Sequence, residues 1–142
     1  MPLSSWATCD ATIESIQQGV DNLSGYHSLQ RTDAEKQLTL YTTATDDCTL
    51  YVALSSENNF QFIGQHQHIP YHIASSSSLL SGQVSRLAVE DGQTSFALTI
   101  AAGTPVKAGQ YRDRLTLQLM NENNEVLDDY ELNVDVNIPA NV

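Results

Sequence analysis

Three histidines lie close together in the middle of the sequence: His66, His68 and His72. Residues two apart in a strand share a face, so His66 and His68 would project together, with His72 four positions further along. Grouped imidazoles are typical ligands of zinc and copper, which makes a metal site one hypothesis for this segment. No carboxylate or cysteine is nearby to complete a ligand set, so exposed histidines on an edge segment are the preferred interpretation. We expect no metal and no other cofactor.

The other residue types that could support catalysis do not occur in a catalytic pattern. Asp46-Asp47 and Asp128-Asp129 are adjacent pairs, and adjacent carboxylates in a strand point to opposite faces. Calcium binding by the first pair with a distant acid is an alternative without a recognisable loop. Ser24 lacks a nucleophile elbow, and Asn22 begins a glycosylation triplet of a kind that often arises by chance. No glycine-rich phosphate loop occurs, and we expect no enzyme.

Two cysteines, Cys9 and Cys48, are the only ones in the chain. Neither belongs to a C-x-x-C pair, and two cysteines cannot complete a four-ligand zinc site without histidines. A disulfide is preferred over two free thiols. It would close a loop of about 40 residues, worth about 4 kcal/mol in the chain-entropy model. It would also indicate an oxidising compartment.

Length and charge narrow the class of protein further. The chain has 142 residues, which predicts one domain spanning 1–142 with an ordinary core. Its 17 acidic and 6 basic residues give a net charge of −11, which argues against nucleic acid and anionic membrane surfaces as partners; high solubility is the simplest reading. We find no signal peptide and no run long enough to insert into a membrane. We therefore expect a mature chain whose export signal has been removed.

Alternating apolar residues predict an all-β protein. The clearest strand follows Gly109, where Leu115, Leu117 and Leu119 alternate with polar residues. Tyr111 at its start is similar to the tyrosine corner of Greek-key sandwiches, whose hydroxyl bonds back to a neighbouring loop. A last strand over residues 126–138 places four apolar side chains on one face: Leu132, Val134, Val136 and Ile138.

The remaining strands are shorter. We expect them at residues 6–16, 37–43, 50–54, 60–62, 69–74, 84–89 and 94–101. Pro70 places the segment 69–74 at a sheet edge or makes a strand start there. Residues 17–36 are expected to form a long loop, with a short strand near 26–29 or one helical turn at 33–37. Seven or more strands with polar turns predict an immunoglobulin-like antiparallel β-sandwich with one disulfide.

Three features in this order resemble the spore coat protein U-like domain of archaic chaperone–usher pili. The first is the pairing of Cys9 in the first strand with Cys48, which follows the Leu-Thr-Leu segment at residues 38–40. The second is IPYHI at residues 69–73, and the third is AGQYRDRLTL at residues 108–117, close to that family's signature through Gly109, Tyr111 and Asp113. The resemblance spans about residues 6–120.

The resemblance implies an exported subunit that passes through the periplasm to a cell-surface fimbrium, with other pilus subunits, a periplasmic chaperone and an outer-membrane usher as partners. Shaft subunits of that family lack the last strand, and a donor strand completes their groove. Here the strand at 126–138 follows a hairpin without a Gly-Ser linker. This favours the self-complete N-terminal domain of a two-domain tip adhesin over a shaft subunit carrying a grafted donor strand.

Such an adhesin would mediate attachment and biofilm formation on an abiotic or host surface. If the last strand leads toward a following domain, the binding loops lie at the opposite pole. The loop with Ser78, Leu79 and Leu80 has an apolar tip suited to attachment, although the two leucines could instead pack onto the sandwich; Trp6 is a weaker candidate. The competing hypothesis is an extracytoplasmic sugar- or metal-binding β-sandwich unrelated to pili.

Overall fold

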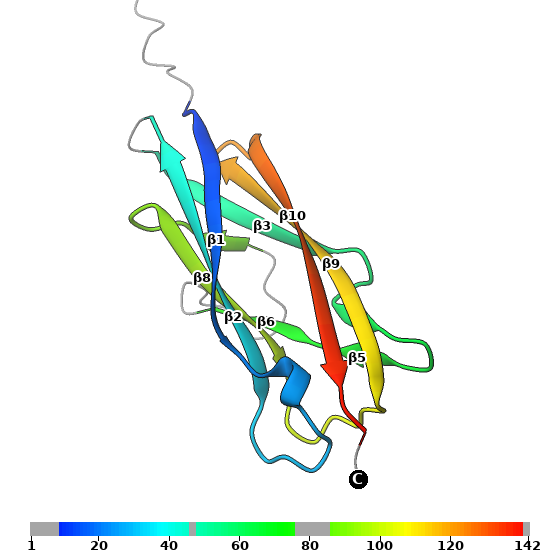
Figure 1. The fold of residues 1–142 in the computed structure, drawn as a ribbon. Helices are drawn as coiled ribbons and strands as arrows, with labels where there is room; N and C mark the ends of the chain where they lie inside the picture. Colours follow the sequence, from blue (N-terminus) through cyan, green and yellow to red (C-terminus); the bar gives the residue numbers. More distant parts are fainter. Residues whose placement is uncertain (1–8, 46–47, 76–85, 141–142) are drawn as a thin grey trace, which may run out of the picture.

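Two antiparallel sheets pack face to face in the computed structural model, which describes residues 9–45, 48–75 and 86–140 (Figure 1). One sheet has the strand order β1-β2-β8-β6, and the other has the order β5-β4-β9-β3-β7 with β10 paired to β9. The predicted antiparallel all-β sandwich is confirmed. No helix in these ranges is long and apolar enough to cross a membrane.

The four longest strands are β1 and β2 in the first sheet and β9 and β10 in the second. The first sheet comprises β1 (Ala11–Asp21), β2 (Ala34–Ala44), β8 (Gln93–Ile100) and β6 (His72–Ala74). The second comprises β5 (His68–Pro70), β4 (Gln61–Ile63), β9 (Gly109–Asn121), β3 (Leu50–Ser56), β7 (Arg86–Ala88) and β10 (Val126–Ile138). A 3-10 turn, η2 (Leu23–Gly25), follows β1.

The core lies between the sheets and is built from the alternating positions that the sequence predicts. Leu115, Leu117 and Leu119 of β9 are fully buried. They face the inward residues of the other sheet, such as Leu38 and Leu40 of β2. Because each strand has a period of two, the same alternation leaves most polar residues of β9 and β10 on the outer surface, whereas Asp113 and Asn121 of β9 occupy inward positions and are buried.

The expectation of a long loop at 17–36 is wrong at both ends. β1 runs on to Asp21 and β2 begins at Ala34, joined through pairs such as Gln17↔Thr39 and Asp21↔Lys36. The helical turn at 33–37 is therefore replaced by strand, and 26–29 is not a strand. Residues 17–21 lie in an edge strand with solvent on most sides, so their side chains carry no alternation for a sequence pattern to reveal.

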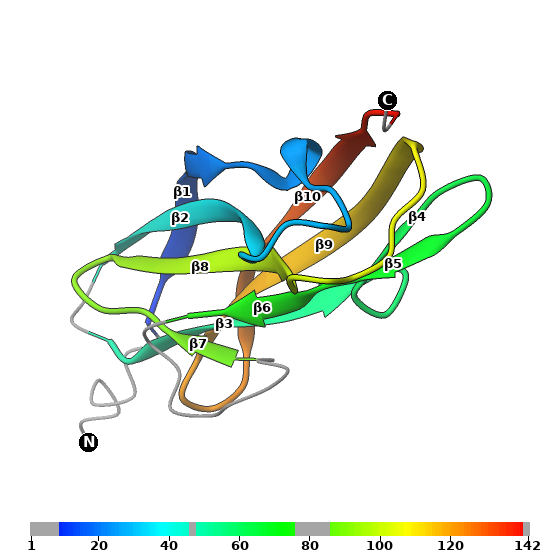
Figure 2. The same ribbon diagram turned by 90° about the horizontal axis from the view of Figure 1, so that it is seen from below.

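The expected strand at 69–74 is split between the two sheets. β5 ends at Pro70 and β6 starts at His72, while the amide of Tyr71 between them donates to the carbonyl of Phe60 at 3.1 Å. β5 is the edge strand of its sheet, as the proline predicts, since a proline cannot donate to a ladder. Figure 2 shows β5 and β6 as separate arrows belonging to different layers.

Candidate functional site

The last strand, β10, is an integral part of the core. It pairs with β9 in an unbroken antiparallel register from Asp128↔Leu119 to Ile138↔Gly109. Three of its inward side chains, Val134, Val136 and Ile138, are buried, and Leu132 is partly buried. The strand therefore supplies apolar surface that the two sheets would otherwise leave open to water.

The second edge of β10 faces β1 of the opposite sheet (Figure 1). The amide of Ile13 in β1 donates to Asp128 Oδ2 at 2.7 Å. Near the other end, the amide of Asn137 donates to Ser24 Oγ at 3.1 Å. β10 thus fills the side of the sandwich between β9 and β1.

The turn that leads into β10 is organised by its own side chains. Asn121 is buried, and its Oδ1 accepts hydrogen bonds from the amides of Asn123 at 2.9 Å and Glu125 at 3.0 Å. Its Nδ2 donates to Glu125 Oε1 at 3.1 Å. Asn124 adopts a positive φ of 63°, which asparagine tolerates better than most residues. This hairpin is specified locally.

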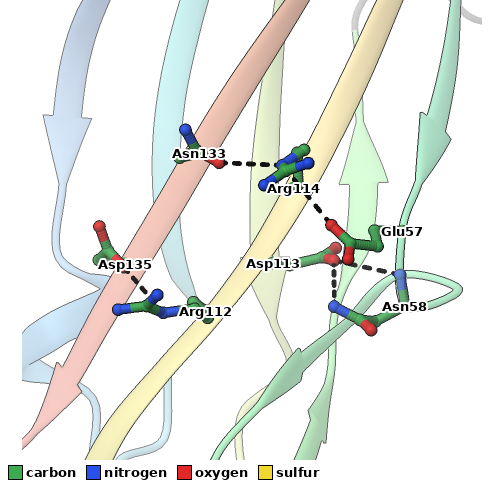
Figure 3. A pocket seen from close by; sticks show the side chains of 7 residues that line it. All are labelled: Glu57, Asn58, Arg112, Asp113, Arg114, Asn133 and Asp135. Atoms are coloured by element: carbon green, nitrogen blue, oxygen red, sulfur yellow. Dashed lines mark hydrogen bonds and ion pairs between the residues drawn. The ribbon is translucent and has the colours of Figure 1, made fainter.

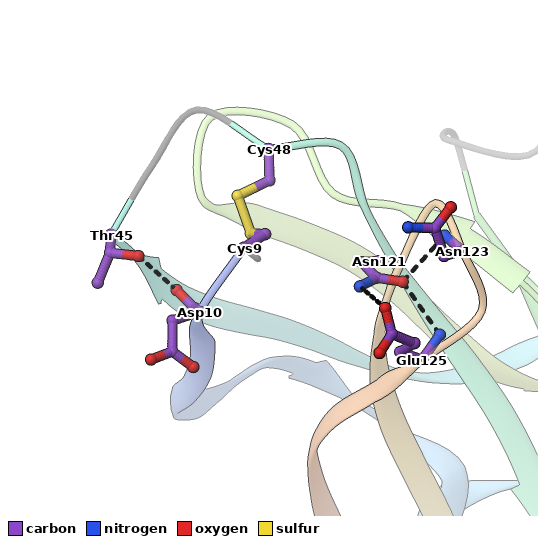
Figure 4. Close-up of a disulfide and its surroundings, with 7 residues drawn as sticks. All are labelled: Cys9, Asp10, Thr45, Cys48, Asn121, Asn123 and Glu125. Carbon is purple, nitrogen blue, oxygen red and sulfur yellow. Dashed lines mark hydrogen bonds between the residues drawn. A yellow bond between two sulfur atoms is a disulfide. The ribbon is translucent and has the colours of Figure 1, made fainter. Parts of the chain in front are cut away.

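The disulfide lies at the same end of the sandwich as this hairpin (Figure 4). Cys9 and Cys48 are bonded, which confirms the predicted pair. Thr45 donates to the carbonyl of Asp10 from both its amide, at 2.9 Å, and its hydroxyl, at 3.2 Å. The β2–β3 connection and the β9–β10 turn therefore form one end of the molecule, and the chain leaves β10 at the other end (Figure 1).

The tyrosine corner that the sequence predicts is present at the start of β9. The Tyr111 hydroxyl donates to the carbonyl of Lys107 at 2.7 Å and contacts Gln67 Oε1 at 3.3 Å. Gly109 has a φ of +147°, a region that favours glycine. Gly64 lies against the tyrosine ring, and an added Cβ there would come within 2.5 Å of a ring carbon.

Asp113, the third member of the family signature, is a buried carboxylate surrounded by donors. Its oxygens accept from Ser56 Oγ at 2.5 Å, from the amide of Asn58 at 3.2 Å and from Asn58 Nδ2 at 2.9 Å. The Tyr71 hydroxyl also donates to it. A buried charge needs such bonds to offset its lost hydration, and these bonds tie β3, the 57–60 connection and Tyr71 to β9.

Tyr71 stays protonated in this arrangement. Its burial, its hydrogen bond to Asp113 and the negative charge of that carboxylate raise the pKa of Tyr71 well above its ordinary value. The ring stacks on Phe62 with centroids 4.2 Å apart. The Tyr71 hydroxyl therefore serves the fold as a hydrogen-bond donor to Asp113.

A polar depression of about 520 Å³ lies beside this network, on the outer face of β9 and β10 (Figure 3). Every residue that lines it has a polar or charged side chain: Glu57, Asn58, Arg112, Asp113, Arg114, Asn133 and Asp135. In the hairpin register Arg112 faces Asp135 and Arg114 faces Asn133. Such a surface can exchange hydrogen bonds with a polar ligand, whereas it offers little to an apolar one.

The histidines that suggested a metal site are not assembled into one. His68 is in β5 and His72 is in β6, so the two belong to different sheets. Among the described residues, no group of three or more histidine, cysteine or acidic side chains could hold a metal ion. Trp6, Ser78, Leu79 and Leu80, the surface-binding candidates, lie outside the described residues, as does the Asp46-Asp47 pair. The apolar-loop hypothesis thus stays a prediction.

Sequence reasoning missed the polar depression. Part of it could have been found, because counting back from the hairpin turn places Arg112 and Arg114 opposite Asp135 and Asn133. The contribution of Glu57 and Asn58 comes from a connection more than 50 residues away in sequence, as the separation of 55 between Asn58 and Asp113 shows. No local pattern signals that contact.

Comparison with solved structures finds a similar fold in several fimbrial proteins. The Salmonella SafD adhesin has a TM-score of 0.61 at 11% identity, covering 94% of this chain and 99% of that one. Self-complemented MyfA, the major subunit of Myf fimbriae from Yersinia enterocolitica, has a TM-score of 0.58 at 14% identity over 93% and 98% of the chains. AggB, the minor subunit of aggregative adherence fimbriae type I from Escherichia coli, has a TM-score of 0.57 at 12% identity over 88% and 100%.

The same comparisons give no family by sequence. The chain matches no protein-family model and no curated protein sequence. The resemblance to the spore coat protein U-like domain is therefore a hypothesis from the three motifs. At identities of 11% to 14%, the structural likeness establishes the fold alone.

Proposed function

We propose that this chain is a non-enzymatic adhesion module of a cell-surface fimbrium, and that β10 completes its immunoglobulin-like fold from within. The observation that carries the proposal is the position of β10, paired along β9, lying next to β1, with Val134, Val136 and Ile138 in the core. This is the place where an added strand completes an open sandwich edge. The fimbrial names of structures with the same fold support the same class of protein.

Within that class, we infer the self-complete N-terminal domain of a tip adhesin. The support is the β9–β10 turn, in which Asn121 and Glu125 bond to one another and to the turn backbone. A donor strand grafted through a flexible linker would not need such side chains. The disulfide supports export to an oxidising compartment, with a periplasmic chaperone and an outer-membrane usher as the expected assembly partners.

The alternative is a shaft subunit whose groove is filled by an added strand. Its specific support is the MyfA structure, which is described as a self-complemented major subunit and has the same fold. Both hypotheses require β10 to be the strand that fills the groove between β9 and β1 through its own sequence.

Controlled cleavage of the folded protein tests that requirement. A protease site inserted between Asn123 and Asn124 is cut after folding, and the cut protein is mixed with an excess of labelled peptide of sequence 126–138. We expect the cut protein to stay folded and to exchange its strand for the peptide. A peptide carrying Val134→Ser and Val136→Ser should not enter, whereas one carrying Asn133→Ser and Asn137→Ser should. Dissociation without uptake of the matched peptide would contradict the proposed architecture.

Attachment is tested separately. Beads carrying the intact chain through its C-terminal end should adhere to plastic or to host matrix more strongly than beads carrying the reduced, unfolded chain. Equal adherence of both beads on every surface would contradict the adhesion role and leave the strand architecture to stand on the exchange result.

A further inference from the structure

The polar depression lies where β9 changes partners along one edge. β3 pairs with β9 as far as Ser56↔Leu115, and β4 takes over at Ile63↔Arg112. The connection at residues 57–60 borders the gap, and Asn58 and Glu57 of that connection line the depression. The site is thus a feature of the sheet's construction, positioned by two strands and a loop (Figure 3).

The loop that borders the depression is strained and firmly held. Asn59 and Phe60 both have positive φ, 56° and 61°, which asparagine tolerates but which is costly for a bulky residue such as phenylalanine. Ser56 Oγ accepts a hydrogen bond from the amide of Phe60 at 2.8 Å, and Asp113 holds Asn58. A strained backbone conformation persists only where surrounding contacts hold it in place. Such strained residues are concentrated at active and ligand-binding sites.

Two guanidinium groups project into the depression with most of their donors unused. Arg112 and Arg114 are two apart in β9, so they share its outer face at a spacing of about 7 Å. Their side chains are 79% and 50% exposed. The Nε atoms lie 3.7 Å from Asp135 and 3.5 Å from Glu57, longer than the 2.7–2.9 Å or so of a charge-assisted hydrogen bond.

The terminal nitrogens of both arginines are therefore available. Arg114 donates through Nε to Asn133 Oδ1 at 3.3 Å, and the described residues provide no hydrogen bond to an Nη atom of either arginine. Two neighbouring guanidinium forks of this kind suit a carboxylate, whose planar oxygens accept paired N–H donors. The side chains of Asn58, Asn133, Glu57 and Asp135 around them can bond to hydroxyl groups.

The net charge of the protein limits how acidic the ligand can be. At −11 the chain repels a polyanion such as nucleic acid or a heavily sulfated polysaccharide. A single carboxylate on a neutral, hydroxyl-rich body carries the smallest charge that still uses the two arginines. It has to compete with Asp135 for Arg112 and with Glu57 for Arg114, both of which are held only by long, exposed contacts. The depression has a volume of about 520 Å³, within the range of small-ligand sites.

We propose that this depression binds an acidic sugar residue, with the carboxylate between Arg112 and Arg114 and the hydroxyls on Asn58, Asn133, Glu57 and Asp135. The proposal rests on the adhesion role for its biological use, and it names the ligand class of that role. Binding itself is a property of the folded chain, so it is measured independently of strand exchange and of bead attachment.

The test is an amide NMR titration of the intact chain with glucuronic acid and with N-acetylneuraminic acid. Glucose serves as the probe with hydroxyls alone, and acetate as the probe with a carboxylate alone. We expect saturable shifts confined to the backbone near residues 57–58, 112–114 and 133–135. At least one acidic sugar should bind about tenfold or more tightly than glucose and acetate, because each lacks one of the two sets of contacts.

A pair of matched variants separates specific binding from general charge. Arg112→Gln with Arg114→Gln should weaken acidic-sugar binding about tenfold or more, since both charge-assisted contacts are lost. Arg86→Gln with Lys107→Gln removes two exposed positive charges outside the depression and should leave the affinity unchanged. Retained dispersion of the amide spectrum shows that each variant is folded.

Three results overturn the proposal: no localised shifts with either acidic sugar, equal affinity for acetate and the sugars, or unchanged binding in the Arg112/Arg114 double variant. Equal affinity for acetate identifies a general anion site. Any of these results, together with successful strand exchange and bead attachment, removes the acidic-sugar site while the proposed function stands.

Discussion

Replacing Tyr71 with phenylalanine isolates one hydrogen bond of the Asp113 network. The ring contacts survive in Tyr71→Phe, because stacking on Phe62 at 4.2 Å and the edge-on contact with Phe60 at 5.9 Å do not use the hydroxyl. What disappears is a buried O–H donor to a carboxylate. Hydrogen bonds to charged groups contribute about 1.5–3 kcal/mol, so we expect the free energy of unfolding at neutral pH to fall by that amount.

The same substitution predicts a change in pH dependence. Burial first, then the hydrogen bond and charge of Asp113, raise the pKa of Tyr71 above its ordinary value of 10.0. The unfolded chain loses this proton near pH 10 while the folded chain keeps it. The stability that comes from Tyr71 is therefore complete below pH 10 and is lost as the pH rises toward the folded pKa, at up to about 1.4 kcal/mol per pH unit.

Urea unfolding followed by far-UV circular dichroism measures both effects. The gap in unfolding free energy between the wild type and Tyr71→Phe should narrow by about 1.4 kcal/mol between neutral pH and about pH 11. Tyr130→Phe, at an exposed tyrosine of β10, is the matched control and should change stability by less than about 0.5 kcal/mol. A stability of Tyr71→Phe equal to that of the wild type, or parallel pH curves for the two, would refute this account of the network.

Three further changes test the core, the disulfide and the tyrosine corner by the same unfolding measurement. Val136→Ala should cost about 2 kcal/mol through lost burial and a cavity, whereas Asn137→Ala on the exposed face should cost little; equal effects would contradict the inward role of that face. Cys9→Ser with Cys48→Ser should cost about 4 kcal/mol, because the bond spans 39 residues, and the cost should vanish when both proteins are compared under reducing conditions. Gly64→Ala should cost about 1–3 kcal/mol, since its Cβ would lie 2.5 Å from a tyrosine ring; an unchanged midpoint would mean that the ring moves freely aside.

The parts of the fold that the sequence predicts are those with one buried face and one solvated face. Leu115, Leu117 and Leu119 alternate because β9 separates core from water, and Val134 and Val136 do so in β10 for the same reason. The tyrosine corner is equally local, since Tyr111 bonds to the carbonyl of Lys107 four residues before it. Features that depend on residues close together in the chain can therefore be recognised in the sequence.

The parts that escape prediction depend on distant partners or lack a buried face. Residues at the end of β1 pair with β2 through their backbones, so polar side chains such as Gln17 and Gln18 give no sign of strand. The switch of sheets at Tyr71 and the donors around Asp113 join segments 42 to 57 residues apart. The polar depression could not be predicted for the same reason, because Asn58 lines it only once the 57–60 connection has folded against β9.

If the proposed function is right, the short turn before β10 determines whether the domain can occupy a terminal or an internal position in a fimbria. A strand tethered by a short turn has an effective concentration in the millimolar range at its own groove, so an external donor must compete with it or wait for it to leave. The four-residue turn at 122–125 is further held by Asn121, which favours the closed state. Uncut protein should therefore take up the labelled 126–138 peptide only as fast as β10 opens, far more slowly than cut protein. A domain with that property does not accept a neighbour's strand during assembly, and this is the behaviour required of a terminal, surface-binding subunit; rapid uptake by uncut protein would instead favour the shaft subunit.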